Sequence, residues 1–176
     1  MASFLDEVNE KSGTRAERCY QCRKCAAGCP MASAMDAPPN KILRMVQLGR
    51  RAEVLASSAI WLCASCDTCS ARCPNQVDIP RVMDALRGMS IAQGTVAEKN
   101  VLRFHEAFLA SVRRGGRVNE PTMLIHYKLK SKDFFSDVKT GLGMLRKGKL
   151  SFRSPKTRNL ASVKRIFERT EPGRGE

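Results

Sequence analysis

The chain has 176 residues, 31 of them Lys or Arg and 17 Asp or Glu, which gives a formal net charge of +14. No stretch approaches the ~18 to 20 consecutive apolar residues of a membrane helix, so the sequence predicts no transmembrane segment. The first seven residues are acidic and too short in apolar length for an export signal. We therefore expect a cytoplasmic protein under reducing conditions, with one compact domain and an extension.

The positive charge is concentrated in the second part of the chain. Residues 1–100 hold 13 basic and 10 acidic side chains, a net charge of +3, whereas residues 101–176 hold 18 and 7, a net charge of +11. A basic segment can meet nucleic acid, an anionic membrane or an acidic protein, and charge alone does not choose among these partners.

In chain order, the first predicted element is a short helix. Phe4, Leu5 and Val8 share one of its sides, and it ends near Gly13. We expect this helix to pack over the domain that follows, although a frayed terminus is the alternative.

A run of four cysteines follows, and the same spacing recurs later in the chain. Both runs spell C-x2-C-x2-C-x3-C-P, and together they contain all eight cysteines of the protein. The first run comprises Cys19, Cys22, Cys25 and Cys29, and the second comprises Cys63, Cys66, Cys69 and Cys73. Because no cysteine lies elsewhere, the pattern favours metal chemistry over packing or disulfides.

This spacing is typical of cubic [4Fe-4S] clusters. Three closely spaced thiolates can surround one cluster, and in two-cluster proteins the cysteine before proline ligates the other cluster. The predicted ligands of the first cluster are Cys19, Cys22, Cys25 and Cys73. Those of the second cluster are Cys63, Cys66, Cys69 and Cys29.

Other interpretations of the cysteines fit less well. Structural zinc uses separated C-x2-C or H-x3-H pairs and gives a third cysteine no tetrahedral role. A disulfide framework suits small secreted chains. A radical enzyme needs C-x3-C-x2-C, which neither run contains.

The segments after the two runs repeat each other as well. Pro38-Pro39 opens a predicted helix that Gly49 closes, and Asp78-Ile79-Pro80 opens another that ends near Gly94. The buried positions expected in these helices are Ile42, Leu43, Met45, Val46, Val82, Met83, Leu86 and Met89. A further helix is expected through Val54 and Leu55. Four cysteines, a proline and an amphipathic helix therefore occur twice, which indicates an internal duplication on a helical scaffold.

Several residues near the runs are candidates for tuning the clusters. Trp61, just before the second run, is expected to shield a cluster from water, to pack in the core, or to do both. Cations beside the runs would raise a cluster's reduction potential if they lie close to it, but they are equally consistent with solvated side chains. These cations are Arg18, Arg23, Lys24 and Arg72. The two histidines, His105 and His126, are not expected to bind metal.

The C-terminal part of the sequence is also predicted to be helical. One helical face comprises Ala97, Val101, Phe104, Phe108 and Val112, and that helix ends at Gly115-Gly116. Helical pieces are also expected after Pro121, over Phe134 to Leu145, and over a basic, amphipathic segment from Leu160 to Phe167. An amphipathic helix beyond the core more often docks on a partner than stands alone.

The sequence resembles the iron-sulfur C subunit of heterodisulfide reductase in three segments. These are Cys19 through Pro30, Ile60-Trp61-Leu62-Cys63, and Cys63 through Val77 and Ile79. The resemblance covers about residues 15–95 well and implies an all-α fold: an α-helical ferredoxin-like domain over 1–95 with two [4Fe-4S] clusters. Residues 96–176 would then be a helical, basic docking extension.

The resemblance also implies a role and partners. The chain would relay electrons between a flavin-containing A subunit and a catalytic, disulfide-reducing B subunit in a hetero-oligomer. It contains no dinucleotide fingerprint or P-loop, so we expect no catalysis by the chain alone. The alternatives are the iron-sulfur subunit of a quinone-linked or glycolate-type dehydrogenase and a nucleic-acid-binding protein with structural clusters. The apolar positions at helical spacing in 101–176 argue against nucleic acid.

Overall fold

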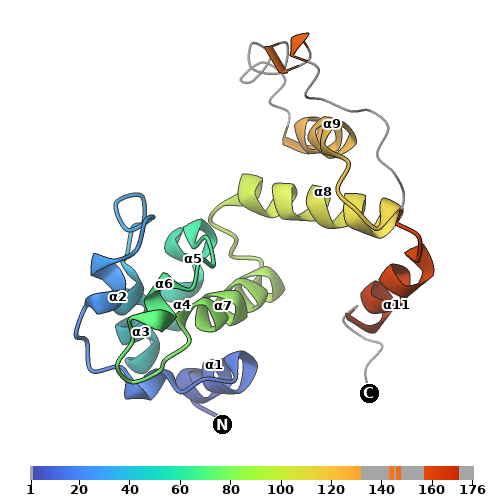
Figure 1. Cartoon of the computed structure of the whole chain (residues 1–176). Helices are drawn as coiled ribbons and strands as arrows, with labels where there is room; N and C mark the ends of the chain where they lie inside the picture. Colours follow the sequence, from blue (N-terminus) through green and yellow to red (C-terminus); the bar gives the residue numbers. More distant parts are fainter. Residues whose placement is uncertain (1, 132–142, 145, 148–156, 171–176) are drawn as a thin grey trace. The chain divides into compact units, whose positions relative to one another are not determined.

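The computed structural model describes residues 2–131, 143–144, 146–147 and 157–170. It divides the chain into two compact units, Met1–Lys99 and Asn100–Glu176. Every regular element of the described residues is a helix (Figure 1), which confirms the predicted all-α class.

The first unit contains seven α-helices and one 3-10 helix in its described residues. They are α1 (Phe4–Ser12), η1 (Ala16–Arg18), α2 (Lys24–Ala27), α3 (Pro39–Gln47), α4 (Arg51–Leu55), α5 (Ala59–Leu62), α6 (Thr68–Ala71) and α7 (Ile79–Gln93). The short helices η1, α2, α5 and α6 flank or interrupt the cysteine runs.

Helix α1 has strong signals at both ends. The Ser3 and Asp6 side chains form a capping box at its N-terminus, and Gly13 adopts φ 63° after its last turn. Val8 is fully buried, and the helix packs against α7 and α3. The predicted helix near the N-terminus is confirmed.

Helix α7 lies at the centre of the first unit. The Asp78 carboxylate accepts a hydrogen bond from the Arg81 N–H at 3.3 Å, and Pro80 occupies the first turn, where a missing N–H costs nothing. The side chains of Val82, Met83 and Leu86 are completely buried. Because α1, α4, α5 and α6 all pack on this helix, it joins the N-terminus to the second cysteine run.

Helix α3 is the counterpart of α7 after the first run. Pro38 and Pro39 set its start, Ile42, Leu43 and Val46 are buried, and Gly49 turns the chain with φ 69°. These features were predicted and are confirmed, as is the following helix α4 with its buried Val54 and Leu55.

Helix α5, just before Cys63, depends on a carboxylate from the first half of the unit. Asp36 accepts hydrogen bonds from the Ser57 hydroxyl at 2.7 Å and from the N–H groups of Ser58 at 3.1 Å and Ala59 at 3.0 Å. Burial raises the pKa of this carboxyl group, but the three hydrogen bonds outweigh burial and lower the pKa overall. Asp36 thus fixes where the segment leading into the second run begins.

The second unit contains helices α8 (Lys99–Gly115), α9 (Glu120–Ser131) and α11 (Leu160–Thr170) in its described residues. The helix through Phe104 is confirmed, but its buried residues are Ala107 and Ser111, whereas Phe104 and Phe108 keep exposures of 39% and 40%. Phe104 meets the Tyr127 ring of α9 edge to face, with centroids 5.8 Å apart. Ala97 precedes α8.

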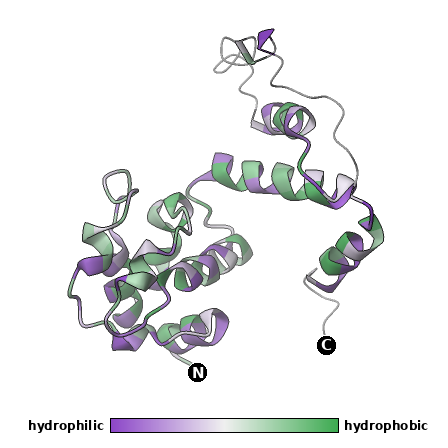
Figure 2. Ribbon diagram, in the orientation of Figure 1, coloured by the Kyte–Doolittle hydropathy of each residue, from purple (hydrophilic) through white to green (hydrophobic). Residues whose placement is uncertain are grey.

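Helix α11 has both hydrophobic and hydrophilic residues around its axis (Figure 2). None of its residues is buried, and Ile166 is 61% exposed. The expected helix over Phe134 to Leu145 falls mostly on residues outside the described part of the chain. None of the described helices is long and apolar enough to cross a membrane.

Candidate metal centre

The two cysteine runs share an unusual backbone. Gln21 and Arg23 in the first run, and Ser65 and Asp67 at the equivalent places in the second, have φ values of 65°, 65°, 48° and 56°. Left-handed residues within a turn direct successive backbone N–H groups toward one side, which creates a concavity for an anionic group such as an iron-sulfur cluster. Because these residues are not glycines, the conformation costs energy that the surrounding structure must supply.

The cysteines themselves repeat in burial, position by position. Cys22 and Cys66 are exposed, Cys25 and Cys69 are buried, and the first and last cysteines of each run are half-buried. The buried members lie on α2 and α6, and these two helices pack against each other. The duplicated sequence therefore folds into two matching cysteine turns in direct contact.

A glycine allows close approach between the runs. The guanidinium group of Arg72 lies over Gly28, and a Cβ at position 28 would clash with its Nη1 atom. A side chain at position 28 would therefore push Arg72 away. Gly28 thus leaves room for the Arg72 side chain beside the first run.

Cysteines from both runs line one cavity. Cys63, Cys66 and Cys69 of the second run line it, together with Cys29 of the first. Apolar side chains complete the wall, among them Met35, Pro39, Ile79, Pro80 and Met83. Cys73, the second run's own fourth cysteine, is not among the lining residues.

Of the four cysteines that do not line this cavity, three belong to the first run and one, Cys73, belongs to the second. Burial raises the pKa of the Cys19 thiol, and the neighbouring sulfurs of Cys73 and Cys22 raise it further. Burial likewise raises the pKa of the Cys25 thiol, with contributions from Cys19 and Cys22. Cys73 therefore lies near the first run rather than at the cavity of the second.

Burial also raises the pKa of the Cys69 thiol to about 11, with the sulfurs of Cys63 and Cys25 as further causes. Exposed Cys66 differs, because its hydrogen bonds with Thr68 lower the pKa of its thiol. Buried thiols that resist ionisation in the protein alone become thiolates when iron supplies the compensating charge. Among the described residues, no three His, Cys, Asp or Glu side chains are grouped to hold a single metal ion.

Two hydrogen bonds reach sulfur around the proposed first cluster. The Gln21 amide donates to Cys19 Sγ at 3.3 Å, and buried Asn40 of α3 donates to Gln21 Oε1 at 3.2 Å. The Val77 N–H donates to Cys73 Sγ, also at 3.3 Å. N–H donors to thiolate sulfur stabilise the more negative, reduced form of a cluster. Eight sulfurs in two groups, with such donors and with left-handed residues in both turns, fit two [4Fe-4S] clusters.

Gln47 and Arg87 hold the backbone that enters each run. Gln47 at the end of α3 donates to the carbonyl oxygens of Ala16 at 3.1 Å and Cys19 at 2.9 Å. Arg87 on α7 donates to the carbonyl oxygens of Ile60 and Cys63. In both runs the accepting residues are the first cysteine and the residue three positions before it. No sequence pattern indicated this pairing, because Gln47 and Arg87 stand at different distances from their runs.

Other residues predicted near the site have mixed outcomes. Trp61 is 3% exposed on α5 and does not line the cavity, and its buried indole N–H has no hydrogen-bond partner among the described residues. Arg18, Arg23, Lys24 and Arg72 are exposed. His105 and His126 lie on α8 and α9, in the other unit from the cysteines.

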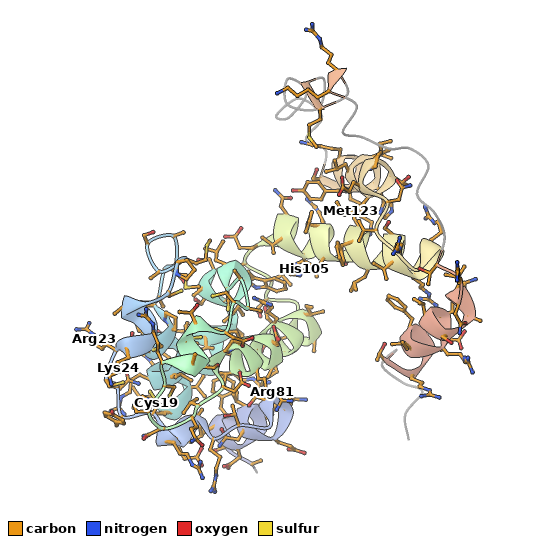
Figure 3. The ribbon with its side chains drawn as sticks, in the orientation of Figure 1. Cys19, Arg23, Lys24, Arg81, His105 and Met123 are labelled. Atoms are coloured by element: carbon orange, nitrogen blue, oxygen red, sulfur yellow. The ribbon has the colours of Figure 1, made fainter. Side chains whose placement is uncertain are left out.

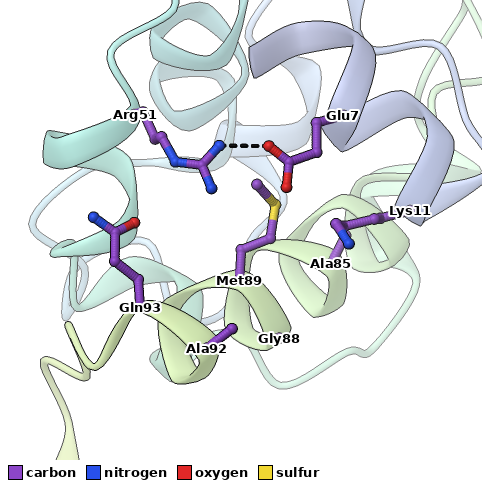
Figure 4. Close-up of a pocket in the computed structure, with 8 residues that line it drawn as sticks. All are labelled: Glu7, Lys11, Arg51, Ala85, Gly88, Met89, Ala92 and Gln93. Atoms are coloured by element: carbon purple, nitrogen blue, oxygen red, sulfur yellow. Dashed lines mark hydrogen bonds and ion pairs between the residues drawn. The ribbon is translucent and has the colours of Figure 1, made fainter. Parts of the chain in front are cut away.

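Another cavity of the first unit is lined by residues of α1, α4 and α7 (Figure 4). Glu7 and Arg51 form an ion pair at its edge, and Gly88 and Met89 contribute to its wall. No cysteine lines it. It is therefore separate from the cysteine-lined cavity.

Comparison with known proteins agrees with this chemistry. Residues 18–78, which contain both runs, match the family of 4Fe-4S dicluster domains. The iron-sulfur C2 subunit of CoB–CoM heterodisulfide reductase from Methanocaldococcus jannaschii is 33% identical over 141 residues, which cover 75% of each chain. This chain belongs to the heterodisulfide reductase C-subunit family.

Further relatives in the heterodisulfide reductase C-subunit family match over shorter regions. The C subunit of ferredoxin:CoB–CoM heterodisulfide reductase from Methanosarcina acetivorans is 39% identical over 83 residues, or 47% of this chain and 33% of the relative. The C subunit of H2:CoB–CoM heterodisulfide,ferredoxin reductase from Methanothermobacter thermautotrophicus is 27% identical over 120 residues. That match covers 68% of this chain and 64% of the relative, so the chain spans slightly less than two thirds of that protein.

The family resemblance predicted from the residues is thus confirmed, and so is the cofactor. The dicluster domain and the eight cysteines give this member of the heterodisulfide reductase C-subunit family two [4Fe-4S] clusters.

Proposed function

We propose that this chain is the electron-relay subunit of a heterodisulfide reductase-like complex. It would pass electrons between a flavin-containing A subunit and a catalytic, disulfide-reducing B subunit, and it would not be catalytic alone. The observation that carries this proposal is the pair of matching cysteine turns in contact within one unit. Each [4Fe-4S] cluster supplies one-electron chemistry when bound.

The proposed ligands combine both runs. Cys19, Cys22, Cys25 and Cys73 would hold the first cluster, and Cys63, Cys66, Cys69 and Cys29 the second. Support comes from the cavity that Cys29 shares with the second run and from the Cys73 sulfur near Cys19. Such crossed ligation would tie α2 and α6 together, so that the cluster-to-cluster distance is fixed by the fold.

The chain's own residues have definite tasks in this relay. Gln47 and Arg87 hold the entry to each run, and Met35, Ile79 and Met83 keep water from the second cluster. Exposed Cys22 and Cys66 leave one edge of each proposed site open to a partner. Eight thiols that must stay reduced until iron is inserted favour a cytoplasmic location.

We also propose that the second unit, the predicted extension over 96–176, docks the chain in its complex. The support is a net charge of +11 over residues 101–176 together with exposed apolar side chains on its helices. Leu109, Ile125, Leu129 and Ile166 are each about half exposed or more. An acidic partner surface with an apolar groove would cover both kinds of side chain.

The decisive experiment is anaerobic purification of the native complex, followed by rapid mixing. Reduction of the flavin subunit should produce the spectra of the reduced clusters. Addition of a disulfide substrate should then restore the spectra of the oxidised clusters. Co-purification with a quinone-linked or glycolate-type dehydrogenase instead would retain the relay and refute the heterodisulfide reductase assignment. Clusters that neither partner reduces or oxidises would refute the relay itself.

A further inference from the structure

The two cysteine turns match in backbone and burial but differ in charge. Positions 44 residues apart correspond, so Arg18, Arg23 and Lys24 of the first run stand where the second has Leu62, Asp67 and Thr68. The three cations are exposed, and so is Asp67. The segment around Cys22 therefore carries three positive charges whose counterparts around Cys66 are an apolar, an acidic and a neutral residue, and Arg72 of the second run lies over Gly28 of the first.

Other arginines of the same unit form ion pairs that these three cations do not form within the described residues. Arg15, Arg50, Arg51, Arg81 and Arg87 each lie within 4.0 Å of a carboxylate oxygen. In the part of the chain that the structure describes, no carboxylate forms such a pair with Arg18, Arg23 or Lys24. Figure 3 shows Arg23 and Lys24 at the periphery of the first unit, with Arg23 extending outward.

An aromatic side chain lies between these cations in the sequence. Tyr20, two residues before Cys22, is 61% exposed. The second run has Ala64 at the corresponding position. Exposed aromatic and arginine side chains in one patch are typical of protein interfaces, where they supply most of the binding energy.

We propose that the patch formed by Arg18, Tyr20, Arg23 and Lys24 docks an acidic face of a redox protein against the open edge at Cys22. This inference rests on the proposed relay function, because only an electron-transfer partner needs a cluster edge at its surface. Charge complementarity identifies the partner, since three exposed cations within four residues of an exposed cysteine would orient a negatively charged surface before contact. The neutral to acidic edge at Cys66 would then serve a different partner, so the two ends of the relay are not interchangeable.

The test uses two reciprocal substitutions at corresponding left-handed positions, Arg23→Asp and Asp67→Arg. Each places the other run's residue in the same backbone conformation, so both chains should fold and keep their iron. The probe is the redox subunit that co-purifies with the wild-type chain, titrated against the full-length protein with both clusters. Its Kd is measured at low and at physiological salt.

Arg23→Asp should raise the Kd about tenfold at low salt and flatten its salt dependence, as expected for a charge at an interface rim. Asp67→Arg should change the Kd by less than about twofold. Equal effects of the two substitutions, or none, would overturn the proposal. A shifted cluster potential with an unchanged Kd would also overturn it, because the cations would then act only on the cluster.

Two further probes separate other sources of negative charge. A DNA duplex and vesicles of anionic phospholipid should bind the wild-type chain and Arg23→Asp equally. Weaker binding of either probe by Arg23→Asp, with the redox subunit unaffected, would assign the patch to nucleic acid or membrane and refute the proposal. The Kd does not depend on electron flow, so a failure of the relay itself would be recognised separately by rapid mixing.

Discussion

Cys29 and Cys73 are the residues on which the crossed arrangement depends. We expect Cys29→Ser to perturb the same cluster signal as Cys66→Ser, because Cys29 lines the cavity with Cys63, Cys66 and Cys69. Cys73→Ser should instead match Cys22→Ser, because the Cys73 sulfur lies near Cys19. Electron paramagnetic resonance spectra of the four reduced variants provide the measurement.

The four variants serve as controls for one another. Cys22→Ser and Cys66→Ser define the spectrum of each damaged cluster without any assumption about crossing. If the spectrum of Cys29→Ser matched that of Cys22→Ser, each run would keep its own fourth cysteine, and the crossed assignment would be wrong.

Among individual residues, the spacing of the cysteines indicated the cofactor, whereas the backbone conformation around them could not be predicted. Four cysteines at fixed spacing have few alternative uses, so the spacing alone indicates the chemistry. Gln21 and Arg23 could not be recognised, because the left-handed conformation usually calls for glycine and the fold imposes it here on other residues. Trp61 was predicted to shield a cluster or to pack in the core; it does not line the cavity, and its 3% exposure agrees with core packing.

Among the helices, the contact between α7 and the entry to the second run can be tested at Arg87. Its side chain is 14% exposed, and it donates to the carbonyl oxygens of Ile60 and Cys63. Arg87→Ala should lower the free energy of unfolding by about 1 to 3 kcal/mol, because the substitution leaves partly buried carbonyl groups without donors. It should also alter the spectrum of the second cluster more than that of the first. Urea unfolding of the protein with its clusters and paramagnetic resonance measure the two effects.

Arg81 on the same helix is the matched control. Its side chain is 65% exposed, and its ion pair with Asp78 is long, at 3.9 Å. Arg81→Ala should change the unfolding free energy by no more than about 0.5 kcal/mol. If Arg87→Ala lowered the free energy of unfolding no more than Arg81→Ala does, α7 would not hold the second run in the way we describe.

The longer helices were predictable from apolar spacing, proline starts and glycine stops, as α1, α3 and α7 illustrate. The short helices α2, α5 and α6 were not, because about four residues are too few to show a helical period. The cap that Asp36 places on α5 joins residues more than 20 positions apart, and such contacts leave no local pattern.

For the molecule in its complex, the proposed docking role of the second unit can be tested by truncation. A chain that ends near Gly148 lacks α11, none of whose residues is buried, so both clusters and their spectra should survive. The truncated chain should nevertheless co-purify poorly with the catalytic subunit and lose electron transfer to it. Subunit stoichiometry after anaerobic purification and rapid mixing are the measurements.

Two point substitutions on α11 refine that experiment without deleting residues. Ile166 is 61% exposed, and Ile166→Glu should weaken the complex as the truncation does. Exposed Ala161 lies about 140° away around the helix, so Ala161→Glu should have little effect. Full retention of the complex by the truncated chain would refute the docking role, and so would a truncation whose sole defect was lost nucleic-acid binding.

The charge difference between the two parts of the chain was visible in the sequence, but the partner that it serves was not. The spacing of apolar residues predicted that Phe104 and Phe108 share one face of α8, and the structure leaves both partly exposed while it buries Ala107 and Ser111. Periodicity identifies a shared face of a helix, but packing decides whether that face is covered within the chain.

The proposed relay depends on two clusters that can each pass one electron. The most direct measurement is iron and sulfide analysis of the anaerobically purified chain, combined with a coulometric redox titration. We expect about eight iron, about eight sulfide and about two electrons per chain. Stoichiometric zinc without sulfide, or uptake of a single electron, would contradict this expectation.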